Sequence, residues 1–208
     1  MHVTTVNLLA SQNFTFKRIA YSALCLLLDE KSEVLLLSTQ TIKKDLQNQN
    51  PSIVALALNA IGEVCTAEMC RELATEVANL MKSEESYLKK KAACACSKII
   101  RKCPELIDTF IKFIPSYLEE KHHGVLLSGL SLLIQIFQQD ASFVNKFIKY
   151  TSTIIKYLRS LLSISYSPEY DVNGITDPFL QAKLVETLGY FFKDSSVPQE
   201  VQDILSTI

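Results

Sequence analysis

The chain has 208 residues, of which 48% are hydrophobic, and its 21 basic and 22 acidic residues leave a net charge of −1. This balance gives no overall electrostatic attraction to nucleic acid or to an anionic membrane surface. A chain of this length can bury a core without disulfides or metals. Only 5 glycines and 6 prolines are present, which favours a mainly helical fold.

Apolar residues recur with helical spacing along most of the chain. Pro51 suits a first helical position, and Thr66 and Asp177 suit N-caps. In chain order, the predicted helices cover about residues 3–11, 14–28, 33–47, 52–65, 67–82, 87–101, 105–118, 125–138, 141–163, 178–192 and 198–208.

One pattern recurs within these helices at steps of about 37, 35, 36 and 56 residues. Such a period is typical of stacked helix pairs that bury their apolar faces against their neighbours. It predicts an all-α, armadillo- or HEAT-like right-handed helical solenoid of about 10–12 helices without a sheet. Three sets of corresponding positions define the pattern: first Ala20, Ala57, Ala92, Ser128 and Leu184, second Ala23, Ala60, Ala95, Ser131 and Thr187, and third Leu24, Ile61, Cys96, Leu132 and Leu188.

The last step is longer because residues 166–177 interrupt the repeat and the preceding helix is extended. This segment is rich in turn-forming residues, and a helix cannot continue past Pro168. Neither end of the chain carries a polar capping repeat, which a free-standing solenoid needs. We therefore expect residues 1–208 to form a single solenoid segment that is truncated at both ends.

The sequence carries no motif for catalysis. We find no phosphate-binding loop, no G-x-G-x-x-G, no G-x-S-x-G and no H-E-x-x-H. The pattern therefore predicts no enzyme, no catalytic residue and no cofactor. It also shows no secretory signal and no apolar run of the roughly 20 residues that span a membrane.

Metal binding is also not expected. His122 and His123 are adjacent, so on a helix they point about 100° apart and make poor joint ligands. Oxygen ligands in the 166–177 loop lack the spacing of a calcium loop. No Cys-x-x-Cys pair occurs, and most of the cysteines fall on apolar helix faces, as small core residues do. These cysteines are Cys25, Cys65, Cys70, Cys94, Cys96 and Cys103.

Several stretches resemble the large subunits of clathrin adaptor complexes, the adaptins. The most specific is Tyr-Ser-Pro-Glu-Tyr-Asp-Val-Asn-Gly-Ile-Thr-Asp-Pro-Phe-Leu-Gln at residues 166–181, which is similar to the gamma-adaptins of the trans-Golgi and endosomal complex. Alpha-type adaptins fit the central repeats but lack this loop, and epsilon-type adaptins are a closer alternative. The other stretches cover residues 10–19, 27–30, 42–46, 68–74, 87–93, 100–106 and 123–126.

The resemblance implies a non-enzymatic scaffold in vesicle-mediated protein transport. It implies assembly with a beta-type adaptin and with medium and small adaptor subunits. The expected location is cytoplasmic, peripheral on Golgi and endosomal membranes and on clathrin-coated vesicles. An unrelated helical-repeat scaffold, such as a nuclear transport receptor or a kinase-associated HEAT array, is the alternative from a different class.

The resemblance also implies a docking site for an Arf-type GTPase in its GTP form. Aligned through residues 10–12, the matching positions are Val3, Val6 and Leu37, where the family prefers leucine. Residues 35–37 are three consecutive leucines, which span most of a helix circumference, so at least one must point outward or sit at an edge. Core packing is an equally good explanation for Val6.

Overall fold

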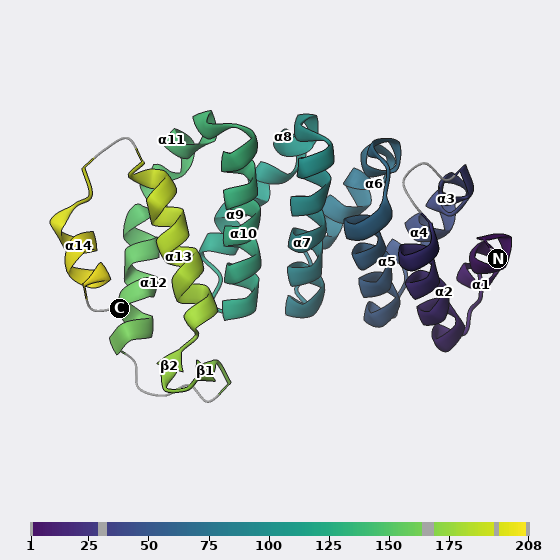
Figure 1. The fold of residues 1–208 in the computed structure, drawn as a ribbon, viewed down its shortest axis with the longest axis horizontal. Helices are drawn as coiled ribbons and strands as arrows, with labels where there is room; N and C mark the ends of the chain where they lie inside the picture. Colours follow the sequence, from purple (N-terminus) through teal and green to yellow (C-terminus); the bar gives the residue numbers. More distant parts are fainter. Residues whose placement is uncertain (1, 29–32, 164–168, 194–195, 207–208) are drawn as a thin grey trace. The chain divides into compact units, whose positions relative to one another are not determined.

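A computed structural model describes residues 2–28, 33–163, 169–193 and 196–206. The chain divides into two compact units, an N-terminal unit of residues 1–113 and a C-terminal unit of residues 114–208. Figure 1 shows that both units are built from packed helices. The predicted all-α helical-repeat class is confirmed.

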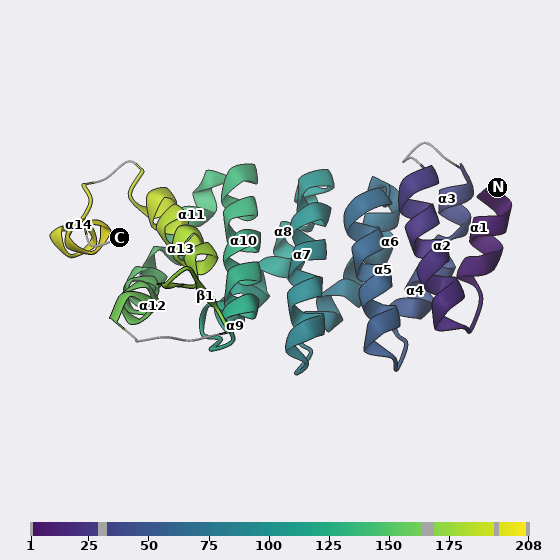
Figure 2. The ribbon, with the colours of Figure 1, turned by 60° about the horizontal axis from the view of Figure 1, so that its bottom comes forward.

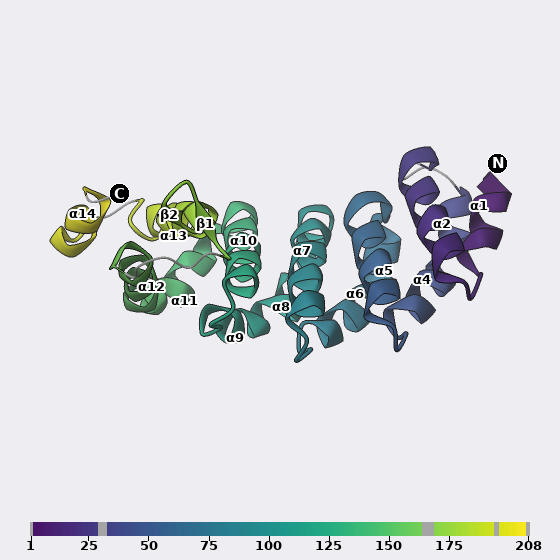
Figure 3. The ribbon, with the colours of Figure 1, turned by 90° about the horizontal axis from the view of Figure 1, so that it is seen from below.

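The N-terminal unit contains helices that pair in sequence order. Within it, α2, α5 and α7 form one row, and α4, α6 and α8 form a second row against them (Figure 3). The bounds are α1 His2–Leu9, α2 Phe14–Leu27, α3 Glu33–Leu37, α4 Thr39–Leu46, α5 Pro51–Val64, α6 Ala67–Leu80, α7 Ser86–Lys102, η1 Pro104–Leu106, α8 Ile107–Phe110 and η2 Ile111–Phe113.

The C-terminal unit follows the same scheme. Here α10 packs against α9 and α13, and α13 also packs against α12. The bounds are α9 Ile114–Leu118, α10 His123–Gln139, η3 Ala141–Phe143, α11 Val144–Phe147, η4 Ile148–Tyr150, α12 Thr151–Ser163, β1 Asp171–Val172, β2 Ile175–Thr176, α13 Pro178–Phe191 and α14 Gln199–Leu205.

The helix starts follow the local chemistry expected from the sequence. The Thr66 side chain accepts a hydrogen bond of 3.2 Å from the Met69 N–H at the start of α6. Pro51 occupies the first position of α5, where its missing N–H costs nothing. Asp177 caps α13 by accepting from the Leu180 N–H at 3.0 Å. All three predictions are confirmed.

Three predicted helices are interrupted. The segment at 33–47 divides at Ser38 into α3 and α4, and the Ser38 hydroxyl donates to the Leu35 carbonyl. The tracts at 105–118 and 141–163 alternate between 3₁₀ and α geometry. Short 3₁₀ turns keep nearly the same apolar spacing as an α-helix, so the sequence pattern does not reveal them.

The expectation of no sheet was wrong at one place. Val172 pairs with Ile175 and Asp171 with Thr176 in a two-stranded antiparallel hairpin. Its turn is Asn173-Gly174, and both residues have positive φ, 55° and 84°. This is the turn that an Asn-Gly dipeptide favours between short strands.

The repeat positions form the core. Every member of the first and third predicted sets is buried, and so are Ala60, Ala95 and Thr187 of the second set, whereas Ala23 and Ser131 are half-buried. Close helix approach adds to this packing, because a Cβ atom at Gly129 of α10 would lie 2.5 Å from the Cβ atom of Tyr117 on α9. Among the described residues, no helix is both long and apolar enough to cross a membrane.

Candidate functional site

The three consecutive leucines of α3 point in different directions. Leu35 is fully buried, whereas Leu36 is 43% exposed and Leu37 is 71% exposed. The expectation that at least one of them faces outward is therefore confirmed. An exposed leucine of this kind is a candidate anchor for a partner protein.

The second part of the predicted site lies on α1. Figure 2 shows α1 beside α2 and α3, and α1 packs against both. Val6 of α1 is half-buried. Val3 belongs to α1, but its side chain lies outside the described part of the structure. The fold therefore brings together the two helices that carry the predicted positions.

Two lysines lie on α4, the helix that follows α3. The Lys43 Nζ atom lies 3.4 Å from the Glu76 Oε1 atom of α6, and Lys44 is exposed to solvent.

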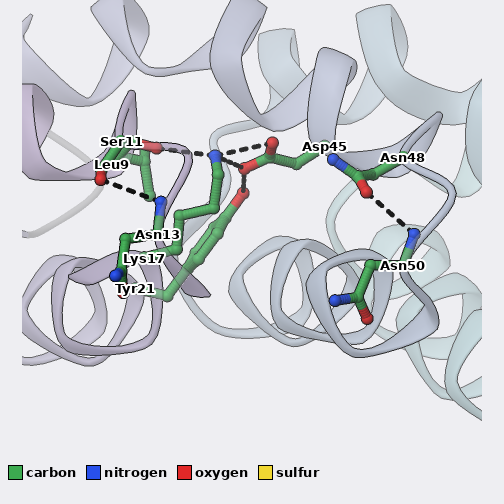
Figure 4. Close-up of polar contacts among 8 residues, drawn as sticks. All are labelled: Leu9, Ser11, Asn13, Lys17, Tyr21, Asp45, Asn48 and Asn50. Atoms are coloured by element: carbon green, nitrogen blue, oxygen red, sulfur yellow. Dashed lines mark hydrogen bonds and ion pairs between the residues drawn. The ribbon is translucent and has the colours of Figure 1, made fainter. Parts of the chain in front are cut away.

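A buried polar cluster lies beneath these helices and was not predicted. Lys17 is only 2% exposed, although a charged side chain usually lies at the surface. Its Nζ atom lies 2.6 Å and 2.8 Å from the two carboxylate oxygens of Asp45 on α4 (Figure 4). Lys17 is therefore a buried cation with a buried counter-charge.

Two further groups complete this cluster. The Lys17 Nζ atom also donates to the Leu9 carbonyl at 2.8 Å, and the Tyr21 hydroxyl donates to the Asp45 Oδ2 atom at 2.9 Å. Burial raises the pKa of Tyr21 well above its usual value, and the charge of Asp45 raises it further. The hydroxyl therefore stays protonated and acts as a donor.

A sequence signal for this cluster existed. Lys17, Ala20, Tyr21 and Leu24 are the buried residues of α2, and their spacing is that of one helix face. A lysine on the apolar face of a helix requires a buried acceptor. The acceptor could not be identified from spacing, because Asp45 is 28 residues away.

The histidines of the C-terminal unit have structural partners. His122 caps α10 through its Nδ1 atom, which accepts from the Gly124 N–H at 3.1 Å. The Nδ1 atom of His123 lies 2.9 Å from the Asp177 Oδ2 atom, and its ring stacks on Tyr170 at 4.4 Å. These two contacts of His123 therefore fasten the hairpin segment to the start of α10.

The loop carboxylates are likewise used within the fold. Asp171 accepts from the Gly174 N–H at 2.9 Å, and Asp177 caps α13. Within the described ranges, no group of three or more His, Cys, Asp and Glu side chains could hold a metal ion. Four of the six cysteines are buried, whereas Cys25 is half-buried and Cys94 is exposed.

Comparison with known proteins agrees with this architecture. The chain is 42% identical over 205 residues to AP-1 complex subunit gamma-1 of Arabidopsis thaliana, covering 98% of the chain and 23% of that protein. It is 35% identical over 206 residues to AP-1 complex subunit gamma-like 2 of Homo sapiens, covering 98% of the chain and 26% of that protein. The chain thus spans about a quarter of the length of these curated relatives.

Structural comparison shows the same fold. A homology model of the full-length AP-3 complex in an intermediate open conformation matches all of the chain and 33% of its own, with a TM-score of 0.72 at 19% identity. A designed armadillo repeat protein matches 98% of the chain and 87% of its own, with a TM-score of 0.61 at 14% identity.

The family model described as "Adaptin N terminal region" matches residues 1–208. This match favours an adaptin over the alternative of an unrelated helical-repeat scaffold. The chain therefore belongs to the adaptin N-terminal family.

Proposed function

We propose that this chain is part of a non-enzymatic scaffold subunit of a clathrin-associated adaptor complex. The observation that carries the proposal is its similarity, over 98% of its length, to gamma subunits of AP-1 complexes. By this similarity, the gamma type is favoured over the epsilon and alpha types. The subunit would act in protein sorting between the trans-Golgi network and endosomes, and residues 1–208 would form one solenoid segment of it.

The proposed partners are a beta-type adaptin and the medium and small adaptor subunits. The complex would be cytoplasmic and peripheral on Golgi and endosomal membranes and on clathrin-coated vesicles. Stacked helix pairs support such a role because they expose long lateral surfaces without needing a pocket.

Co-purification with adaptor subunits tests this proposal. The chain is expected to capture the small subunit of an AP-1 complex in preference to the small subunits of alpha- and epsilon-containing complexes. Equal capture of all three would contradict the assignment to the gamma type, and capture of none would contradict the scaffold role.

We further propose that α1 and α3 dock an Arf-type GTPase in its GTP form through Val3, Val6 and Leu37. Leu37 supports this because it is the most exposed of the three α3 leucines. Replacing an anchor that becomes buried on binding is expected to cost about 2 kcal/mol or more of affinity.

The Leu37→Glu variant tests the docking site. It should capture less of the GTP-loaded GTPase than the unmodified chain, while its thermal unfolding stays the same. Leu205→Glu is the matched control, because Leu205 is an exposed leucine on α14 in the C-terminal unit. Equal capture by Leu37→Glu and Leu205→Glu would remove the site from consideration.

A further inference from the structure

The buried cluster around Lys17 links the two segments that carry the proposed docking residues. Leu9 is the last residue of α1, the helix of Val6. Asp45 lies on α4, which follows α3 and its Leu37 after a single intervening residue. The Lys17 Nζ atom lies between them, at 2.8 Å from the Leu9 carbonyl and 2.6 Å from the Asp45 Oδ2 atom (Figure 4).

Each contact satisfies a group that would otherwise be costly in the interior. A carbonyl in the last turn of a helix has no intrahelical donor, and a cation is favourable there. A buried carboxylate needs a counter-charge and hydrogen-bond donors, which Lys17 and Tyr21 provide. The three N–H donors of the Lys17 ammonium group can therefore form hydrogen bonds to both α1 and α4.

Apolar packing alone does not set this arrangement. Leu9 and Leu24 are fully buried, but contacts between apolar groups are non-directional and permit small shifts along a helix axis. Hydrogen bonds to a carbonyl and a carboxylate require short distances and defined directions. The polar cluster thus supplies directional contacts between the end of α1 and α4.

We propose that Lys17 is a positioning residue, which holds α1 in place against α3 and α4 and so sets the spacing of the GTPase-docking residues on these helices. This inference rests on the proposed docking function. Lys17 itself is buried and makes no contact with the partner; its effect passes through Leu9 and Asp45.

The test separates positioning from stability. Lys17→Met alone leaves the Asp45 carboxylate without its counter-charge and endangers folding. The triple variant Lys17→Met/Tyr21→Phe/Asp45→Leu instead replaces the whole cluster by apolar side chains, a change that is often neutral for stability. We expect its thermal midpoint to be retained, while its α1 amides exchange hydrogen about tenfold faster and those of α5 and α7 stay unchanged.

Binding of the GTPase, loaded with a non-hydrolysable GTP analogue, is the second measurement. The triple variant should show a Kd at least about tenfold higher than the unmodified chain. Arg71→Met is the matched control, because Arg71 forms a cation–carboxylate pair with Glu105 at 2.8 Å that does not involve α1, α3 or α4. This control should bind as the unmodified chain does.

The possible outcomes distinguish the two proposals. Unchanged exchange in α1 of the triple variant would overturn the positioning role, whatever the binding result. Faster exchange in α1 of the triple variant with an unchanged Kd for the GTPase would also overturn the positioning role, provided that the Leu37→Glu variant binds the GTPase poorly. Normal binding by Leu37→Glu would instead overturn the docking function, and α1 exchange would still report on the cluster itself.

Discussion

Two side-chain pairs in this chain, each with an aspartate as one partner, have similar distances but different surroundings. In the N-terminal unit, the Lys17 and Asp45 side chains are 3% and 4% exposed. In the C-terminal unit, the His123 and Asp177 side chains are 26% and 9% exposed. The first pair is closed off from water, whereas water reaches the second. We therefore expect that burial, more than distance, decides how much each pair constrains the fold.

The physical reason lies in solvation. Removing one partner from a buried pair leaves a charge that water cannot solvate, whereas a partly exposed charge is rehydrated. The Lys17 pair also connects three helices, α1, α2 and α4. The His123 pair fastens one short hairpin segment to α10. Substitutions at the first pair should therefore have the larger effects.

The largest effect is expected for Lys17→Met. The substitution leaves the buried Asp45 carboxylate without its counter-charge, although the Tyr21 hydroxyl still donates to it, so unfolding should become easier by about 3–5 kcal/mol. Urea denaturation followed by circular dichroism measures this change. A loss below about 1 kcal/mol, the size found for exposed pairs, would remove the contrast between the two regions.

Alkaline pH should affect the two regions differently through their tyrosines. Burial raises the pKa of Tyr21 above its value of about 10 in an unfolded chain. Above that pH the unfolded state loses the proton and the folded state keeps it, so the free energy of unfolding should fall by about 1.4 kcal/mol per pH unit.

The Tyr21→Phe variant should remove this alkaline slope. Tyr170, which stacks on His123, is the matched control, because desolvation raises its pKa as well but its side chain is partly exposed. Unfolding free energies measured across alkaline pH should change little in slope for Tyr170→Phe. If the unfolding free energies of Tyr21→Phe and Tyr170→Phe change with pH at the same slope, burial does not distinguish the two regions.

The sequence predicted the apolar part of these regions better than the polar part. Ala20 and Leu24 were expected in the core because they repeat with the helical period, and both are buried. The burial of Lys17 was not predicted, because a charged side chain usually favours solvent and its partner is distant in sequence. The periodicity thus reveals which face is buried, whereas it does not reveal which polar groups meet there.

The candidate site shows the same division. Three consecutive leucines indicate that one must face outward, and the structure shows that Leu36 and Leu37 do so. The abundance of turn-forming residues in the 166–177 segment does not by itself indicate the hairpin. The Asn173-Gly174 dipeptide was the available signal, since it favours a turn between two short strands.

A moderate effect is expected at Asp177, which caps α13 and has a φ of 46°. Asp177→Ala removes the cap and places alanine in a left-handed conformation, so the loss should be about 1–2 kcal/mol. Asp177→Asn should lose less, because asparagine can cap a helix and tolerates positive φ. Chemical denaturation of both variants compares them, and equal losses would contradict the role of the cap.

The smallest effect is expected for the imidazole of His123, whose ring combines two interactions that substitutions can separate. His123→Phe keeps an aromatic ring to stack on Tyr170 but removes the hydrogen bond to Asp177. Because Asp177 still accepts from the Leu180 N–H, this change should cost at most about 1 kcal/mol.

His123→Ala removes the stacking as well, which should add about 0.5–1.5 kcal/mol to the loss. Hydrogen exchange of the Gly174 and Asp177 amides measures the effect locally, because both amides donate hydrogen bonds within the hairpin segment. Fast exchange in His123→Ala and near-normal exchange in His123→Phe would show that stacking fastens the segment. Equally fast exchange in His123→Ala and His123→Phe would show that the hydrogen bond between His123 and Asp177 fastens the segment. This partly exposed pair would then constrain its segment as strongly as a buried pair does.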